Sequence, residues 1–139
     1  MKKIIIFLLL LLVLTGCQLE QPQSKQPLDF SKINMGLEAE FALRNARQIY
    51  QQAKTAGQDL ASGPCLSNEL QGNPDYPQTL WVLDISHNPR QAIDDSPVNQ
   101  CLAYLEDKAD NFIELDPDGQ LIKLYSPALS QDQLQYYNK

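Results

Sequence analysis

The chain contains a single histidine, His87, in the polar stretch DISHNPR. An imidazole titrates near neutral pH and acts as a general base when a carboxylate orients it. Asp84, Asp94 and Asp95 are close enough in the sequence to supply that carboxylate. Ser86 is adjacent to His87, which places it poorly as a nucleophile for this base. A small hydrolase that uses His87 with one of these carboxylates is one hypothesis, and a solvated histidine in a polar loop is the alternative.

Other signatures of catalysis and metal binding are missing from the sequence. A zinc site needs three or four Cys or His ligands, whereas the chain has one His and three Cys. The patterns Gly-x-Ser-x-Gly and His-Glu-x-x-His, and a glycine-rich phosphate loop, do not occur. We therefore predict neither a cofactor nor a metal.

The N-terminus combines Lys2 and Lys3 with an unbroken apolar run from Ile4 to Leu14. Eleven helical residues extend about 17 Å, which is too short for a hydrocarbon core of about 30 Å. A basic start, an apolar run of this length and small residues before a cleavage site are typical of a secretory signal peptide. Residues 1–16 are predicted to be that peptide.

The segment Leu14-Thr15-Gly16-Cys17 resembles the lipobox of bacterial lipoproteins. This resemblance covers the first seventeen residues and implies that the chain is cut before Cys17, whose sulfur receives a diacylglyceryl group. Several acyl chains on one residue give a lasting membrane anchor. The resemblance therefore implies an extracytoplasmic protein held to the cell membrane or the outer membrane through the lipid on Cys17.

The mature chain is expected to be an acidic domain on a flexible tether. Removal of residues 1–16 takes two lysines and leaves a net charge of −8, which argues against binding to nucleic acid. Residues 17–28 contain mostly glutamine, proline and other polar residues, and the ten from Gln18 to Pro27 reach about 30 Å when extended. Residues 29–139 are predicted to form one small domain.

Cys65 and Cys101 are the two cysteines that remain. Because the compartment permits oxidation, we predict a disulfide between them. Closing a loop of 37 residues is worth about 4 kcal/mol in the chain-entropy description. A redox pair is the alternative, but reactive dithiols are usually spaced Cys-x-x-Cys.

Hydrophobic periodicity predicts an α+β fold, in which a long N-terminal amphipathic helix packs on a small, mostly antiparallel sheet. Apolar residues recur with a helical period from about residue 31 to residue 56, with Arg44, Arg47 and Gln51 on the polar face. Residues 63–79 are expected to be a loop. Further helices are expected from Ser96-Pro97 onward and over residues 131–137, and strands over residues 80–85, 111–115 and 120–125.

Asp116-Pro117-Asp118-Gly119 is predicted to be the turn of a hairpin between the last two strands. The pattern could also suggest a calcium loop. However, an EF-hand beginning at Asp116 needs Gly at its sixth position and Glu at its twelfth, where this chain has Leu121 and Pro127. We therefore favour the turn.

The polar loop from Ser86 to Ser96 is the candidate recognition loop, because a strand and a helix would hold it rigidly. Its charged residues, with the end of the preceding strand, are Asp84, His87, Arg90, Asp94 and Asp95. We favour a non-enzymatic binding or structural module, with a partner in the cell envelope. The alternatives are an inhibitor or adaptor of an envelope enzyme and a small hydrolase. A deep pocket around His87 would favour the hydrolase, whereas a protruding, rigid loop over a domain without a pocket would favour the binding module or the inhibitor.

Overall fold

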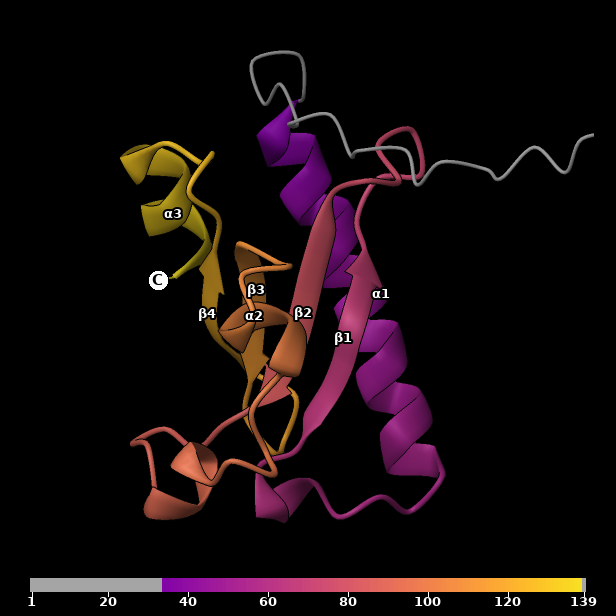
Figure 1. Cartoon of the computed structure of the whole chain (residues 1–139), viewed down its shortest axis with the longest axis vertical. Helices are drawn as coiled ribbons and strands as arrows, with labels where there is room; N and C mark the ends of the chain where they lie inside the picture. Colours follow the sequence, from indigo (N-terminus) through magenta and orange to yellow (C-terminus); the bar gives the residue numbers. More distant parts are fainter. Residues whose placement is uncertain (1–33, 139) are drawn as a thin grey trace, which may run out of the picture.

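The computed structural model describes residues 34–138. The predicted signal peptide, the tether and the first residues of the expected long helix therefore lie outside the described residues. The helices and strands within them are α1 (Met35–Thr55), β1 (Cys65–Gln71), β2 (Leu80–Ile85), α2 (Leu102–Leu105), β3 (Asn111–Leu115), β4 (Leu121–Tyr125) and α3 (Gln131–Tyr137). Two short 3-10 helices, η3 (Leu60–Ser62) and η4 (Ala92–Asp95), complete the order (Figure 1). No helix among residues 34–138 is long and apolar enough to cross a membrane.

The four strands form one sheet in the order β1-β2-β3-β4. The pairs β1–β2 and β3–β4 are antiparallel, whereas β2 and β3 run parallel. A parallel pair needs a crossover connection, and residues 86–110 supply it. Figure 1 shows α1 behind the sheet and α2 in front of it. The structure thus confirms an α+β protein with helices, a mostly antiparallel sheet and one disulfide.

Helix α1 is built to lie close to the sheet. The side chain of Asn34 caps its start by accepting a hydrogen bond from the amide of Leu37 at 3.2 Å. Ala39, Ala42 and Ala46 are completely buried along one side. Their small side chains allow the helix backbone to approach the strands, which places α1 in the main core.

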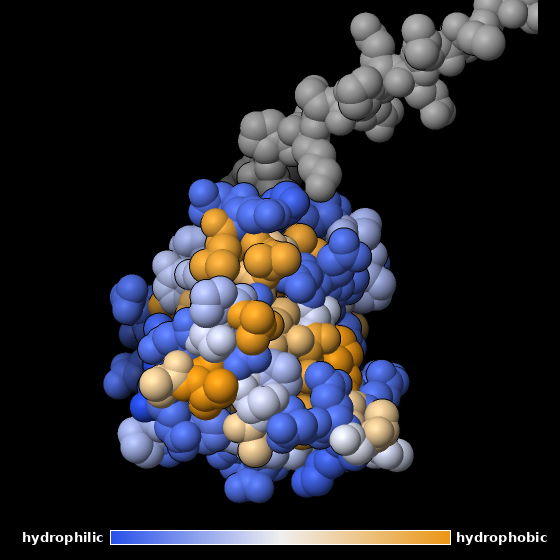
Figure 2. Space-filling view, turned by 60° about the horizontal axis from the view of Figure 1, so that its bottom comes forward, coloured by the Kyte–Doolittle hydropathy of each residue, from blue (hydrophilic) through white to orange (hydrophobic). Residues whose placement is uncertain are grey.

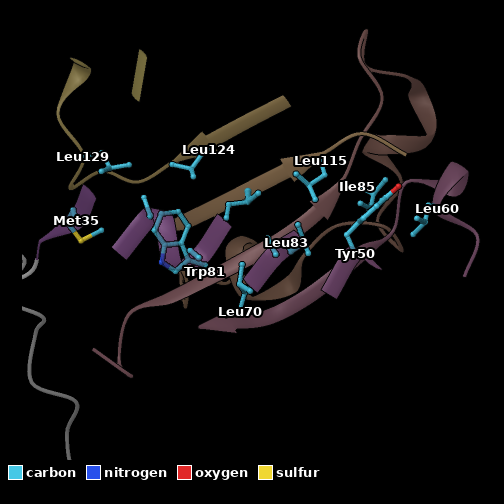
Figure 3. Close-up of a cluster of buried hydrophobic side chains, with 14 residues drawn as sticks. Met35, Tyr50, Leu60, Leu70, Trp81, Leu83, Ile85, Leu115, Leu124 and Leu129 are labelled. Atoms are coloured by element: carbon cyan, nitrogen blue, oxygen red, sulfur yellow. The ribbon is translucent and has the colours of Figure 1, made fainter. Parts of the chain in front are cut away.

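Alternation along β2 divides its side chains between the two faces of the sheet. Trp81, Leu83 and Ile85 are fully buried in the main core, which Figure 3 shows between α1 and the strands. Val82 belongs to a second, smaller core on the other face, together with Cys101. The crossover therefore packs on the face of the sheet opposite α1.

The prediction of a loop over residues 63–79 is wrong for the first half of this range, because Cys65–Gln71 forms strand β1. This strand lies at the edge of the sheet, and its pairing with β2 shifts register between Cys65 and Ser67 and again between Ser67 and Leu70. Only Leu70 in it is buried. An irregular edge strand lacks the regular alternation by which a strand is recognised in a sequence.

The helix expected from Ser96-Pro97 is also corrected, since α2 covers only Leu102–Leu105. The amide of Asn99 donates to the carbonyl of Ser96 at 2.9 Å, which makes this segment a turn. The side chain of Asn99 donates to the carbonyls of Ser62 at 2.6 Å and Ile93 at 2.9 Å. These bonds favour the turn over a helix, and Val98 is left 88% exposed.

The C-terminal elements follow the prediction. The amide of Gly119 donates to the carbonyl of Asp116 at 2.8 Å, which closes the turn between β3 and β4. Ser130 and Gln133 form the expected capping box at the start of α3. Tyr50 of α1 supports the turn, because its hydroxyl donates to the carbonyl of Pro117 at 3.1 Å.

Candidate functional site

His87 contacts a buried carboxylate in the crossover. Its Nδ1 lies 2.8 Å from Oδ1 of Asp94, whose side chain is fully buried. The Oδ2 of Asp94 accepts the backbone amides of His87 at 3.1 Å and Gln91 at 2.7 Å. Burial acts to raise the pKa of Asp94, but these hydrogen bonds and the imidazole outweigh it and hold the pKa below its usual value. Asp94 is therefore ionised at neutral pH and fixes the proton of His87 on Nδ1.

The geometry around Asp94 organises the loop itself. Its carboxylate accepts the amide of Gln91, the residue that precedes η4, and Asp94 and Gln91 form a capping box at the start of this helix. Gly63 lies beside it, where an added Cβ would approach Oδ1 of Asp94 to 2.7 Å. The side chain of Gln100 also donates to the backbone carbonyl of Asp94. One buried residue thus holds together the beginning and the end of this part of the crossover.

Arg90 joins the loop to the sheet. Its Nε donates to Oδ1 of Asp95 at 2.9 Å, and its Nη1 donates to Oε1 of Glu114 on β3 at 2.9 Å. The hydrogen bond with Asp95 and the charge of Glu114 raise the pKa of Arg90 further above its usual value. Of the carboxylates that the sequence placed near His87, Asp94 contacts the imidazole and Asp95 pairs with Arg90.

Asp84 and Glu114 are register partners on the parallel strands β2 and β3. The hydroxyl of Ser86 donates to Oδ2 of Asp84 at 3.1 Å and lies 3.5 Å from Oε1 of Glu114. Burial raises the pKa of Asp84 to about 7, with Glu114 and Asp94 adding to the increase. Ser86 and Arg90 act in the opposite direction. Asp84 therefore changes its charge near neutral pH.

A cavity of about 140 Å³ lies next to this pair of carboxylates. Its lining residues come from β2, β3 and the crossover and are Val82, Asp84, Arg90, Gln100, Cys101, Tyr104, Phe112 and Glu114. His87 is not one of them. This cavity is therefore not the pocket around His87 that would favour a hydrolase, because it lies around Asp84 and the imidazole contacts Asp94 instead.

Ser86 and His87 take part in different interactions. The Ser86 hydroxyl bonds to the carboxylate of Asp84, and Nδ1 of His87 contacts Asp94. A nucleophile needs its base within about 2.6–3.2 Å, and no such contact joins these two side chains in the described part of the chain. Within residues 34–138 no group of three or more His, Cys, Asp or Glu side chains could hold a metal ion.

The disulfide attaches the crossover to β1. Cys65 and Cys101 are bonded, with their Cα atoms 5.1 Å apart. Next to it, the amide of Ala103 donates to the side chain of Asn68 at 2.9 Å. The disulfide and the bond from Ala103 therefore attach this part of the crossover to β1, and the bond from Asn99 to Ser62 attaches it to η3.

The crossover also exposes apolar side chains. Seven large apolar side chains are exposed among residues 34–138, and five of them lie on this segment: Ile93, Val98, Leu102, Tyr104 and Leu105. Figure 2 shows apolar groups interspersed with hydrophilic ones over one face of the molecule. Exposed apolar side chains mark an interaction surface where they form a contiguous patch. The recognition loop predicted from the sequence, residues 86–96, contains only Ile93 of this set, so it misses the other four residues.

The polar face of α1 presents a second surface. Arg44 and Arg47 border a groove of about 690 Å³, which Leu121 and Tyr136 also line. The guanidinium of Arg44 lies 4.3 Å from the ring centre of Phe41. The groove is broad and open, and Gln51 does not line it.

Residues 1–18 match the family model of the prokaryotic membrane lipoprotein lipid attachment site. The match confirms the resemblance that the residues up to Cys17 indicated. The chain is therefore a lipoprotein that is anchored through lipid to a membrane of the cell envelope. No curated protein and no solved structure matches the chain.

Proposed function

We propose that this lipoprotein is a non-enzymatic binding module, which recognises a protein partner in the cell envelope through the crossover between β2 and β3. In this proposal Cys17 carries the lipid, residues 17–28 form the tether and residues 29–139 form one domain. The apolar side chains that the crossover exposes carry the proposal, with Val98 88% exposed and Leu105 57% exposed.

Rigidity of the crossover supports this function. The Cys65–Cys101 disulfide, the contact between His87 and Asp94, and the bonds of Asn99 hold the segment before any partner binds. A surface that is already ordered loses little conformational entropy on association, so more of the contact energy appears as affinity. Exposed apolar residues would then supply the buried centre of an interface, with the charged residues around Arg90 at its rim.

Site-specific photocrosslinking in intact cells tests the proposal. A photoreactive amino acid would replace Val98 in one variant and Gln51, an exposed residue of α1, in the other. We expect a discrete adduct from position 98 that position 51 does not give, and the adduct should disappear when Leu102→Ser and Leu105→Ser are added. An adduct from position 51 alone, or one from position 98 that survives both serine substitutions, would contradict the proposal.

An inhibitor of an envelope enzyme is the second candidate, and the loop over residues 86–96 favours it. Figure 1 shows this loop, with η4, projecting from the lower end of the sheet. The Arg90–Asp95 ion pair and the His87–Asp94 contact brace it, as a loop that enters an enzyme cleft requires. If the partner captured from position 98 is an enzyme and the purified lipoprotein lowers its activity, the lipoprotein is an inhibitor of that enzyme. Unchanged activity of the enzyme in the complex would exclude the inhibitor and favour an adaptor or a structural module.

A further inference from the structure

The cavity beside Asp84 has an apolar side and an acidic side. Val82 and Phe112 come from neighbouring strands, and the ring of Tyr104 packs edge-on against Phe112 with centroids 5.2 Å apart. Asp84 and Glu114 follow on the same two strands and on the same face of the sheet. Small-molecule sites typically combine such apolar walls with a few placed polar groups.

Among residues 34–138, the one cation that lines the cavity is Arg90, and its charge is balanced by two carboxylates. Arg90 donates to Asp95 and to Glu114, each at 2.9 Å. Its Nη1 also lies 3.4 Å from the hydroxyl of Ser86. Because Asp95 and Glu114 balance its charge, Arg90 adds no net positive charge to the cavity.

One carboxylate oxygen of Asp84 accepts no hydrogen bond within the described part of the chain. Its Oδ2 accepts from Ser86, but its Oδ1 is buried and has no hydrogen-bond partner among residues 34–138. A buried acceptor without a donor costs free energy, and this cost is larger when the group is charged. Within the described residues Asp84 therefore has one carboxylate oxygen without a donor, and a positively charged donor in the cavity that this residue lines would supply it.

We propose that this cavity binds a primary ammonium group carried on a short alkyl chain. The ammonium would donate to Asp84, and the alkyl chain would lie against Val82, Phe112 and Tyr104. A free alkylamine and the lysine side chain of a peptide share this chemistry. The inference does not depend on the protein partner proposed above, because a free amine would occupy the cavity as well.

Affinity for such a ligand should follow the ionisation of Asp84. The groups around this carboxylate are Glu114 on β3, Arg90 and Asp94 in the crossover, and the hydroxyl of Ser86. Burial raises the pKa of Asp84 to about 7, so its ionised fraction rises about tenfold between pH 6 and pH 8. An alkylammonium keeps its charge over this range, since its pKa is near 10. Binding should therefore be about tenfold tighter at pH 8 than at pH 6.

NMR of the mature lipoprotein in neutral detergent micelles tests the site, with n-butylammonium as the probe. We expect saturable shifts of the amides of residues 82–84 and 112–114, tighter binding at pH 8 than at pH 6, and weaker binding of methylammonium. Tetramethylammonium has no N–H donor and should not bind. A lysine-containing tetrapeptide that binds more tightly than butylammonium would identify a peptide as the source, and weaker peptide binding would identify a free amine. Absence of saturable shifts at both pH values would overturn the proposal.

Three variants make the test specific. Asp84→Asn should weaken butylammonium more than tenfold and remove the dependence on pH, whereas Glu106→Gln, an exposed residue of the same crossover, should change neither. If Asp84→Asn does not fold, Tyr104→Ala keeps the proposal open to refutation, because Tyr104 is 40% exposed. Its loss should weaken butylammonium but not methylammonium. Unchanged butylammonium affinity in either folded cavity variant would overturn the assignment, without bearing on the crosslink from position 98.

Discussion

The indole Nε1 of Trp81 donates a hydrogen bond to Oε1 of Glu38 at 3.0 Å, between α1 and the sheet. The other oxygen of Glu38 accepts the amide of Asn73 at 2.7 Å, and the side chains of Glu38 and Trp81 are fully buried. Gly72 lies so close to this carboxylate that a Cβ there would overlap it. Burial raises the pKa of Glu38, although both hydrogen bonds oppose the increase. One acidic side chain thus joins α1, β2 and the segment after β1.

Glu38→Ala should lower the free energy of unfolding by about 1–3 kcal/mol, because two buried donors lose their acceptor. Glu40→Ala is the matched control, since Glu40 is an exposed acid on the same helix and should change stability by less than about 0.5 kcal/mol. Urea unfolding of the mature lipoprotein in detergent measures both. Equal effects of the two substitutions would show that the hydrogen bonds of Glu38 do not stabilise the core.

Asp84→Asn should change how stability depends on pH. The pKa of Asp84 rises from 3.8 to about 7 on folding, so the folded state binds the proton more tightly than the unfolded state. Its stabilising contribution is therefore complete below pH 4 and is lost as pH rises through 7. The melting temperature of the wild type minus that of Asp84→Asn should decrease as the pH is raised from 4 to 8. A difference that does not vary with pH would show that this carboxyl has an ordinary pKa.

Gly119→Ala should destabilise the hairpin more than Gly57→Ala destabilises the end of α1. Both glycines have positive φ, 87° at Gly119 and 74° at Gly57, so each substitution strains the backbone. Only at Gly119 would the new Cβ meet a neighbour, Cε1 of Tyr50 at 2.5 Å, whereas nothing lies within 4 Å at Gly57. The expected losses are about 1 kcal/mol at Gly57 and at least about 2 kcal/mol at Gly119. Thermal unfolding that ranks them in the opposite order would contradict the packing of Tyr50 under the turn.

The elements that could be predicted from the sequence are those with a local signal. The turn at Asp116–Gly119 and the cap at Ser130 depend on residues within four positions of each other, and both are confirmed. Strand β1 could not be predicted, because its residues are held by pairing with β2 rather than by a pattern of their own. The missed turn at Asn99 has the same origin, since its side chain bonds to Ser62, 37 residues away in the sequence.

The site was predictable in part for the same reason. The proximity of His87, Arg90, Asp94 and Asp95 follows from their nearness in the sequence, although which pairs form does not. Glu114 could not be assigned to the site, because its place beside Asp84 depends on β2 and β3 being parallel neighbours. The sequence shows only that Glu114 stands between two apolar residues of β3, Ile113 and Leu115, which does not reveal its partner on β2.

Cys17→Ser should abolish lipid attachment. The lipid attachment site at residues 1–18 implies that the sulfur of Cys17 carries the anchor. In a Triton X-114 partition of whole cells, the wild-type protein should enter the detergent phase and the serine variant should not. Mass spectrometry should show the acyl groups only in the wild type. A serine variant that remains in the detergent phase without acyl groups would show that another segment holds the protein to the membrane.

The most direct test of the account is the affinity of the purified lipoprotein for the partner captured from position 98. The double variant Val98→Ser with Leu102→Ser removes two exposed apolar side chains of the crossover, and Gln48→Ser with Gln51→Ser removes two exposed polar ones of α1. We expect the crossover variant to bind more than tenfold more weakly, a loss of about 1.4 kcal/mol or more, and the helix variant to bind like the wild type. Equal affinity of the wild type and a folded crossover variant would contradict the assignment of the crossover as the recognition surface.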